Sequence, residues 1–105
     1  MPKLHRDVFT AIDDPTRRTI LCLLAENDMS VGDLTTHFSV SRPAVSRHLR
    51  ILRDCDLVHE ERRGRERVYS LRSRPLKEIR LWIARFDRLW GVKLKTLKSP
   101  SSNIR

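Results

Sequence analysis

Arginines gather in two stretches of the sequence, residues 42–50 and residues 62–67. A guanidinium donates two parallel hydrogen bonds to a phosphate or to the edge of guanine, and a serine hydroxyl bonds either a base or a phosphate. No acidic side chain occurs among residues 41–50, so this stretch can face a polyanion without repulsion. The candidate DNA-binding residues are Ser41, Arg42, Pro43, Ala44, Ser46, Arg47, Arg50, Arg62, Arg63, Arg65 and Arg67.

The side-chain groupings that enzymes use are missing from the sequence. We find no nucleophile beside a base and no pair of acids suited to proton transfer, and the three glycines are too scattered for a phosphate-binding loop. We therefore predict that the chain is not an enzyme and carries no cofactor.

Residues 31–57 have the pattern of a helix, a tight turn and a second helix. Val31, Leu34 and Phe38 fall on one face of a short helix that Ser30 can cap. Residues 39–41 break this pattern, and Ser41 can cap a second helix whose first turn tolerates a proline. Two helices joined by so short a turn are typical of the helix-turn-helix, whose second helix enters the major groove of DNA.

Helical periodicity divides the second helix of this unit into two faces. Val45, Leu49 and Leu52 cluster on one side and predict a buried face, with His48 at its edge in a packing or hydrogen-bonding role. The opposite face holds the arginines, and in isolation it also fits an ordinary amphipathic helix with a solvated basic side.

Residues 57–61 and 66–71 predict two strands of a hairpin, joined by residues 62–65 with Gly64 in the turn. We expect Val58 and Val68 to lie opposite each other and to face the core. Four arginines on a protruding turn would repel one another without a partner, so a wing lying on the DNA phosphates explains them best.

Two helices are predicted upstream. A short one carries Val8, Phe9 and Ile12, and a second begins with Asp14 as N-cap and Pro15 in the first turn. Arg17 and Arg18 lie in the first turn of this second helix, where the positive end of the helix dipole disfavours cations. A nearby phosphate or solvent would relieve this repulsion. The helix is apolar over much of its circumference, so it belongs in the core.

The last predicted helix runs from residue 75 to residue 98 and is long for so small a domain. Its apolar stripe is wider than one small core needs, which predicts a symmetric dimer. Residues 1–98 then form one domain, and residues 99–105 form a flexible tail. The predicted dimer interface comprises Leu76, Ile79, Trp82, Ile83, Phe86, Leu89, Trp90, Leu94 and Leu97.

The length of 105 residues predicts a single domain, and the net charge of +9 favours a polyanionic partner. Positive charge begins at the second helix of the helix-turn-helix: residues 1–41 hold four Lys or Arg against six acids, and residues 42–74 hold ten against five. No apolar run or leader predicts a membrane segment, so we expect a cytoplasmic protein. Cys22 and Cys55 are isolated, and we expect both to be buried or half-buried thiols.

The strings DDPTRRTILCLL, VSRPAVSRHLRILRDCDLV and ERRGRERVYSL together resemble the ArsR-type winged-helix repressors over nearly the whole chain. Within that family the chain looks closest to members with Phe-x-x-x-Trp in the last helix, here Phe86 to Trp90. The resemblance implies a mainly α, winged helix-turn-helix fold with three or four helices, a two-stranded wing and a long C-terminal helix. It also implies a homodimeric repressor that binds a palindromic operator in double-stranded DNA.

Many members of that family sense metals, and their sites can be compared with this sequence. One site uses a Cys-Val-Cys string, and the matching residues here are Ser30, Val31 and Gly32. Another uses carboxylates and histidines on the last helix, which here has Glu78 and Asp87 but no histidine. We therefore expect no metal site. The four histidines lie singly along the chain, at His5, His37, His48 and His59.

Two other functions stay open at this point. A thiol-based redox-sensing regulator would use Cys22 or Cys55. Asp54 and Asp56 would raise the pKa of the Cys55 thiol, which disfavours the reactive thiolate. A non-specific nucleic-acid-binding or interaction module would bind DNA of any sequence equally. The operator, the regulated genes and the inducing signal cannot be read from the sequence.

Overall fold

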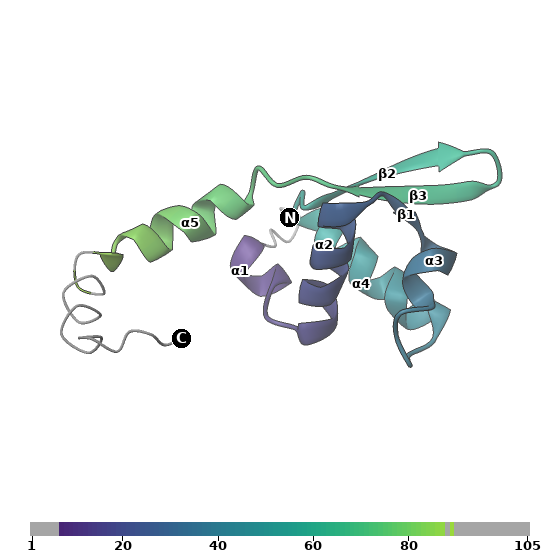
Figure 1. The fold of residues 1–105 in the computed structure, drawn as a ribbon, viewed down its shortest axis with the longest axis horizontal. Coiled ribbons are helices and arrows are strands. Elements are labelled where there is room, and N and C mark those ends of the chain that lie inside the picture. Colours follow the sequence, from purple (N-terminus) through teal and green to yellow (C-terminus); the bar gives the residue numbers. More distant parts are fainter. Residues whose placement is uncertain (1–6, 88, 90–105) are drawn as a thin grey trace, which may run out of the picture.

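The computed structural model of the chain describes residues 7–87 and residue 89. These residues form a helical body from which a hairpin and a last helix extend in opposite directions (Figure 1). The helices are α1 (Val8–Ala11), α2 (Pro15–Glu26), α3 (Val31–Thr35), α4 (Arg42–Asp54) and α5 (Leu76–Ala84). The strands are β1 (Met29–Ser30), β2 (Val58–Arg63) and β3 (Glu66–Leu71).

The predicted winged helix-turn-helix is confirmed, with α3 and α4 as the helix-turn-helix and β2 and β3 as the wing. The described residues hold five helices, which are the four predicted helices of the body and the last helix, although α1 and α3 are only single turns. Each short helix is fixed by its neighbours rather than by its own propensity.

The three helix starts predicted from capping residues all occur in the structure. The Asp14 carboxylate accepts a hydrogen bond of 2.8 Å from the backbone N–H of Thr16, at the start of α2. Ser30 accepts one from Asp33 at 3.1 Å, and Ser41 accepts one from Ala44 at 3.3 Å. Each bond satisfies an N–H group that has no partner within its own helix, which sets where α2, α3 and α4 begin.

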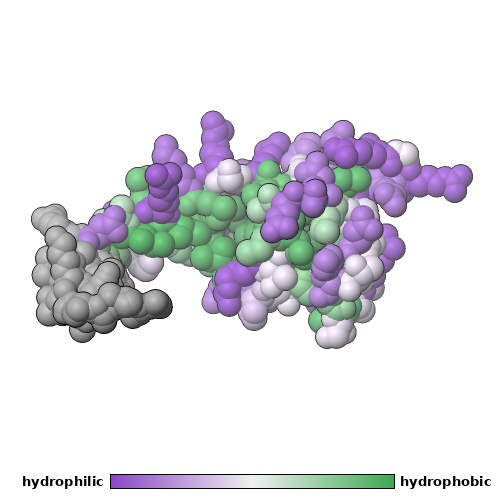
Figure 2. Space-filling view, in the orientation of Figure 1, coloured by the Kyte–Doolittle hydropathy of each residue, from purple (hydrophilic) through white to green (hydrophobic). Residues whose placement is uncertain are grey.

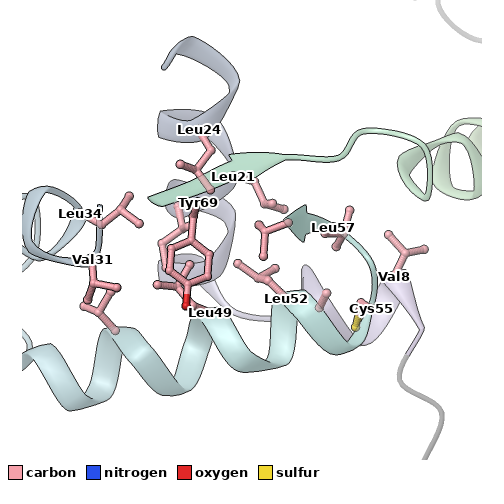
Figure 3. Packing of buried hydrophobic residues seen from close by; sticks show 14 residues of the cluster. Val8, Leu21, Leu24, Val31, Leu34, Leu49, Leu52, Cys55, Leu57 and Tyr69 are labelled. Atoms are coloured by element: carbon pink, nitrogen blue, oxygen red, sulfur yellow. The ribbon is translucent and has the colours of Figure 1, made fainter. Parts of the chain in front are cut away.

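The core lies between α2, α4 and the base of the hairpin (Figure 3). As predicted, Val45, Leu49 and Leu52 of α4 are completely buried. They pack with apolar side chains of α2 and α3 and with the aromatic ring of Tyr69 from β3. Because one face of α4 is locked into this core, its opposite face is held outward in a fixed orientation.

The sheet has the strand order β1-β3-β2, and all pairs are antiparallel. The two-residue strand β1 was not predicted, since two residues carry no periodic pattern. The predicted pairing of Val58 with Val68 is wrong: Val58 lies opposite Leu71, and Val68 lies opposite Glu61. Val58 is buried but Val68 is only half-buried, and it is Tyr69 on β3 that enters the core.

The hairpin turn is tighter than predicted, and this explains the different register. Arg63 pairs with Glu66 across the two strands, so the turn itself consists of Gly64 and Arg65. Gly64 has a φ of +65°, which a residue without a side chain adopts without strain. Arg62 and Arg63 therefore belong to β2 and not to the loop.

Arg17 and Arg18, in the first turn of α2, donate hydrogen bonds to carbonyls at the C-terminal end of α1. Arg17 donates from Nε to the carbonyl of Ala11 at 2.8 Å and from Nη2 to that of Thr10 at 3.1 Å. Arg18 donates to the carbonyl of Ile12 at 2.6 Å. Carbonyls at a helix C-terminus lack partners within the helix, so these two cations complete α1.

Helix α5 begins at Leu76, beside the predicted start, and leans away from the body (Figure 1). Trp82 packs edge-on against Phe9 of α1 with ring centroids 5.6 Å apart. The predicted continuation to residue 98 lies outside the described residues, as do Trp90, Leu94, Leu97 and the tail at 99–105. No helix in the part of the chain that the structure describes is long and apolar enough to cross a membrane.

The prediction that both thiols are buried or half-buried is wrong for Cys22, which is exposed on α2. A helix packed against the core on one side must turn its other side to water, and Ile20, Leu21 and Leu24 take the buried side. Cys55 is buried, and its thiol donates to the backbone carbonyl of Asp7 at 3.4 Å.

Candidate nucleic-acid interface

The exposed face of α4 carries most of the predicted contact residues. All of the predicted contact residues at positions 41–50 are exposed, apart from Ala44, which is partly buried. This face lies opposite the buried Val45, Leu49 and Leu52, so the core orients it. The exposed members are Ser41, Arg42, Pro43, Ser46, Arg47 and Arg50.

The four arginines of the hairpin have different surroundings, a distinction that the sequence did not reveal. Arg63 lies 3.5 Å from the carboxylate of Asp28 and 3.4 Å from that of Glu61. Arg67 donates to Glu60 at 2.7 Å. Arg62 and Arg65 have no acid partner among the described residues, so their positive charges are not compensated there.

Glu60 is the acid that joins the wing to α4. Its carboxylate pairs with Arg67 of β3 through one oxygen and with Arg53 of α4 through the other. Burial alone would raise the pKa of Glu60, but the hydrogen bonds and charges of these two arginines hold it below its usual value. Burial and the nearby Glu60 raise the pKa of Tyr69.

A concave groove of about 460 Å³ separates α4 from β3. Arg42, Ser46 and Arg50 line it from α4, while Arg65 and Arg67 line it from the hairpin. Arg53 also lines the groove but was not among the predicted residues. Its spacing of three residues from Arg50 is the signal that places it on the same side of the helix.

His48 sits at the edge of the core, where it makes the predicted hydrogen-bonding contacts. Its Nδ1 lies 3.2 Å from Nη1 of Arg17 and 3.9 Å from a carboxylate oxygen of Asp14. Burial raises the pKa of Asp14, but the N–H of Thr16 and the charges of His48 and Arg17 lower it by more. This contact ties α4 to the start of α2.

A second surface of interest is the apolar side of α5. Figure 2 shows hydrophobic side chains gathered over this helix and the adjoining body. A shallow hollow beside it is lined by Leu76, Ile79 and Ile83 together with Arg80 and Asp87. The large hydrophobic residues exposed on or just after α5 are Leu81, Trp82, Ile83, Phe86 and Leu89.

At the positions that correspond to a metal-binding string, Ser30 is buried and its hydroxyl caps α3. Within residues 7–87 and 89, no three side chains from His, Cys, Asp and Glu come together in a way that could hold a metal ion.

Comparison with known proteins identifies the family. Residues 14–60 match the sequence profile described as "Bacterial regulatory protein, arsR family". The chain is 42% identical over 80 residues to the transcriptional repressor SdpR of Bacillus subtilis, an alignment that covers 76% of this chain and 89% of the relative. It is also 42% identical to the HTH-type transcriptional regulator Rv2034 of Mycobacterium tuberculosis, covering 72% of this chain and 71% of that protein.

A solved structure supports the same assignment. The crystal structure of an ArsR family transcriptional regulator, RHA00566, superimposes with a TM-score of 0.71 at 29% identity, over 79% of this chain and 86% of that one. The predicted family resemblance is confirmed, and with it the prediction that the chain is not an enzyme. The chain belongs to the ArsR family of winged helix-turn-helix proteins and is a DNA-binding transcriptional regulator.

Proposed function

We propose that this regulator is a cytoplasmic, sequence-specific repressor that binds a palindromic operator as a homodimer and does not respond to metals. The observation that carries the proposal is the exposed face of α4. Its buried side is locked in the core, while Arg42, Arg47 and Arg50 point outward with no acid partner in the described part of the chain. A helix so held can enter the major groove with its arginines toward base edges.

The two groups of arginines take different roles in this proposal. Arg47 and Ser46 on α4 face base edges, since a guanidinium can read guanine through two hydrogen bonds. Arg62 and Arg65 extend from the wing toward the phosphates or the minor groove. Arg63 and Arg67 carry acid partners of their own, so they contribute less to binding than their number suggests.

The homodimer is supported by the apolar side of α5. Leu81, Trp82 and Ile83 are each about half exposed. A monomer in water gains nothing from such a patch, whereas a second copy of α5 would cover it. Two copies related by a twofold axis present two α4 helices, which matches a palindromic site.

Repression and metal independence rest on further arguments. The relative SdpR is named a transcriptional repressor, which favours the same sense of regulation here. Ser30 and Gly32 stand where metal-sensing members have thiolates, and neither can supply one. Ser30 is in addition engaged as the cap of α3.

The experiment that tests the proposal is the selection of genomic DNA fragments by the purified full-length protein, followed by sequencing. We expect a small set of fragments that share a palindrome, bound at least 10³-fold more tightly than random DNA. Retention of fragments without a shared sequence would instead identify a non-specific binder. Reporter expression from a recovered promoter, measured with and without the protein, then distinguishes repression from activation.

A further inference from the structure

The groove between α4 and β3 holds more positive charge than its own acids neutralise. Five guanidiniums line it, from Arg42, Arg50, Arg53, Arg65 and Arg67. Glu66 lines it as well, and Glu60 pairs with two of the five arginines. Five cations against two carboxylates leave three positive charges around one concave space. Like charges gathered in a hollow attract a compensating anion more strongly than the same charges on a convex surface.

Three of the five arginines form no ion pair within the described residues. Glu60 pairs with Arg53 and Arg67, and these three side chains form the wall that joins the wing to α4. Arg42, Arg50 and Arg65 form no ion pair with any residue that the structure describes. Their guanidinium groups are therefore available to a ligand.

The spacing of these groups indicates the shape of the ligand. Arg42 and Arg50 are eight residues apart on α4, which is about 12 Å along the helix axis, and the hydroxyl-bearing Ser46 lies midway. A single phosphate can engage only part of such a row. A groove of about 460 Å³ has room for a larger molecule with two or more linked phosphate groups.

We propose that this groove binds a small ligand bearing at least two phosphate groups, such as pyrophosphate or a nucleoside diphosphate, and that the ligand competes with DNA. Guanidiniums bind phosphate oxygens through paired, charge-assisted hydrogen bonds, and Ser46 adds a neutral donor. The competition rests on the proposed function, in which Arg42, Arg50 and Arg65 face DNA. One guanidinium cannot serve a free phosphate and a DNA phosphate together, so the ligand lowers affinity for DNA.

The test uses pyrophosphate as the probe and the full-length protein without DNA. Isothermal titration calorimetry should show one site per protomer, while sodium chloride of equal ionic strength gives no saturable signal. The double variant Arg42→Gln with Arg50→Gln should bind pyrophosphate at least 10-fold more weakly. Both side chains are exposed, and circular dichroism confirms that the variant is folded.

Arg47→Gln is the matched control, because Arg47 lies on α4 but does not line the groove. It should weaken DNA binding yet leave pyrophosphate affinity within twofold of the parent protein. Pyrophosphate should also raise the apparent Kd for DNA well beyond the effect of sodium chloride at the same ionic strength.

Two results would overturn the inference. One is equal pyrophosphate affinity for the parent and the double variant, and the other is an effect on DNA binding no larger than that of sodium chloride. Specific operator binding would survive either result. Conversely, loss of sequence specificity with intact pyrophosphate binding would reject the proposed function and leave the groove as a phosphate site.

Discussion

The guanidinium of Arg17 in α2 meets the imidazole of His48 in α4, with 3.2 Å between Nη1 and Nδ1. A guanidinium has only donors, so the imidazole Nδ1 is the acceptor in this contact. The same guanidinium also binds the carbonyls of Thr10 and Ala11 at the end of α1. One side chain thus joins α1, α2 and α4.

The first prediction concerns this junction. Arg17→Lys keeps the charge but loses the planar fork that reaches three acceptors at once. We expect a loss of about 1 to 3 kcal/mol in the free energy of unfolding, because partly buried acceptors are left unpaired. Urea denaturation followed by circular dichroism measures it. The matched control is Arg50→Lys, at an exposed site, with an expected change within about 0.5 kcal/mol. Equal effects of the two substitutions would rule out the role given to Arg17.

The second prediction is a dependence of stability on pH that comes from Glu60. Its pKa in the folded chain is lowered from the ordinary 4.5 by Arg67 and Arg53. The ion pairs therefore contribute fully above pH 4.5, and their contribution is lost as the pH falls through the lower pKa of the folded state. Glu60→Gln should flatten the fall of unfolding free energy with decreasing pH over that range.

Urea titrations at a series of pH values measure this slope. The control is Glu61→Gln, which removes one negative charge from the next residue, where the side chain is about half exposed. If Glu60→Gln leaves this slope unchanged, the ion pairs of Glu60 between the wing and α4 do not contribute to the free energy of unfolding.

The third prediction tests the dimer. Ile83 is 49% exposed and lines the hollow beside α5, so a carboxylate there would be buried in a symmetric interface. Ile83→Glu should shift the protein from dimer to monomer in sedimentation velocity at micromolar concentration. Lys77→Glu, an exposed position near the start of the same helix, should leave the dimer intact. If the parent protein is monomeric, both the proposed homodimer and the proposed palindromic operator are contradicted.

The fourth prediction separates base reading from phosphate contact. Arg47→Ala should cost about 1 to 3 kcal/mol on the operator and much less on random DNA. Arg65→Ala should weaken both DNAs alike and reduce the slope of log affinity against log salt by about one per lost contact, or about two per dimer. Fluorescence anisotropy over a salt series measures both. If the two variants lose operator and random affinity by the same factor, α4 does not read sequence.

The fifth prediction concerns metals. Zinc, cadmium and arsenite should leave operator affinity unchanged, since Ser30 and Gly32 offer no thiolate and α5 as described has no histidine. Anisotropy titrations of protein previously treated with a chelator measure this. Tight, stoichiometric uptake of any of the three with release of DNA would contradict the expectation.

Local features of the fold could be predicted from the sequence because local residues cause them. Asp14, Ser30 and Ser41 cap helices through bonds to N–H groups two or three residues ahead. The buried face of α4 follows from its periodicity alone. By contrast, the pairing of Val58 with Leu71 depends on how many residues the turn takes up, and a shift in that number moves every cross-strand pair.

The residue types of the candidate site could be predicted from the sequence, but the ion pairs and hydrogen bonds of its arginines could not. Whether an arginine is free depends on acids distant in sequence, such as Asp28 for Arg63 and Glu60 for Arg53. Arg17 reaches His48 across 31 positions, which no local pattern encodes. Such contacts arise only when the helices have packed together.

The strand order β1-β3-β2 leaves β2 with one edge that no described strand covers. An open edge of unpaired backbone groups invites another chain to add a strand, which is how aggregation begins. The sequence of β2, VHEERR, places charges at four of its six positions and so makes such pairing unfavourable. The charged residues of this strand, arginines included, thus disfavour self-association through this edge. Variants in which arginines of the wing are replaced by neutral residues should therefore be checked for self-association by light scattering. In a DNA-binding assay, self-association of such a variant would look like weaker binding.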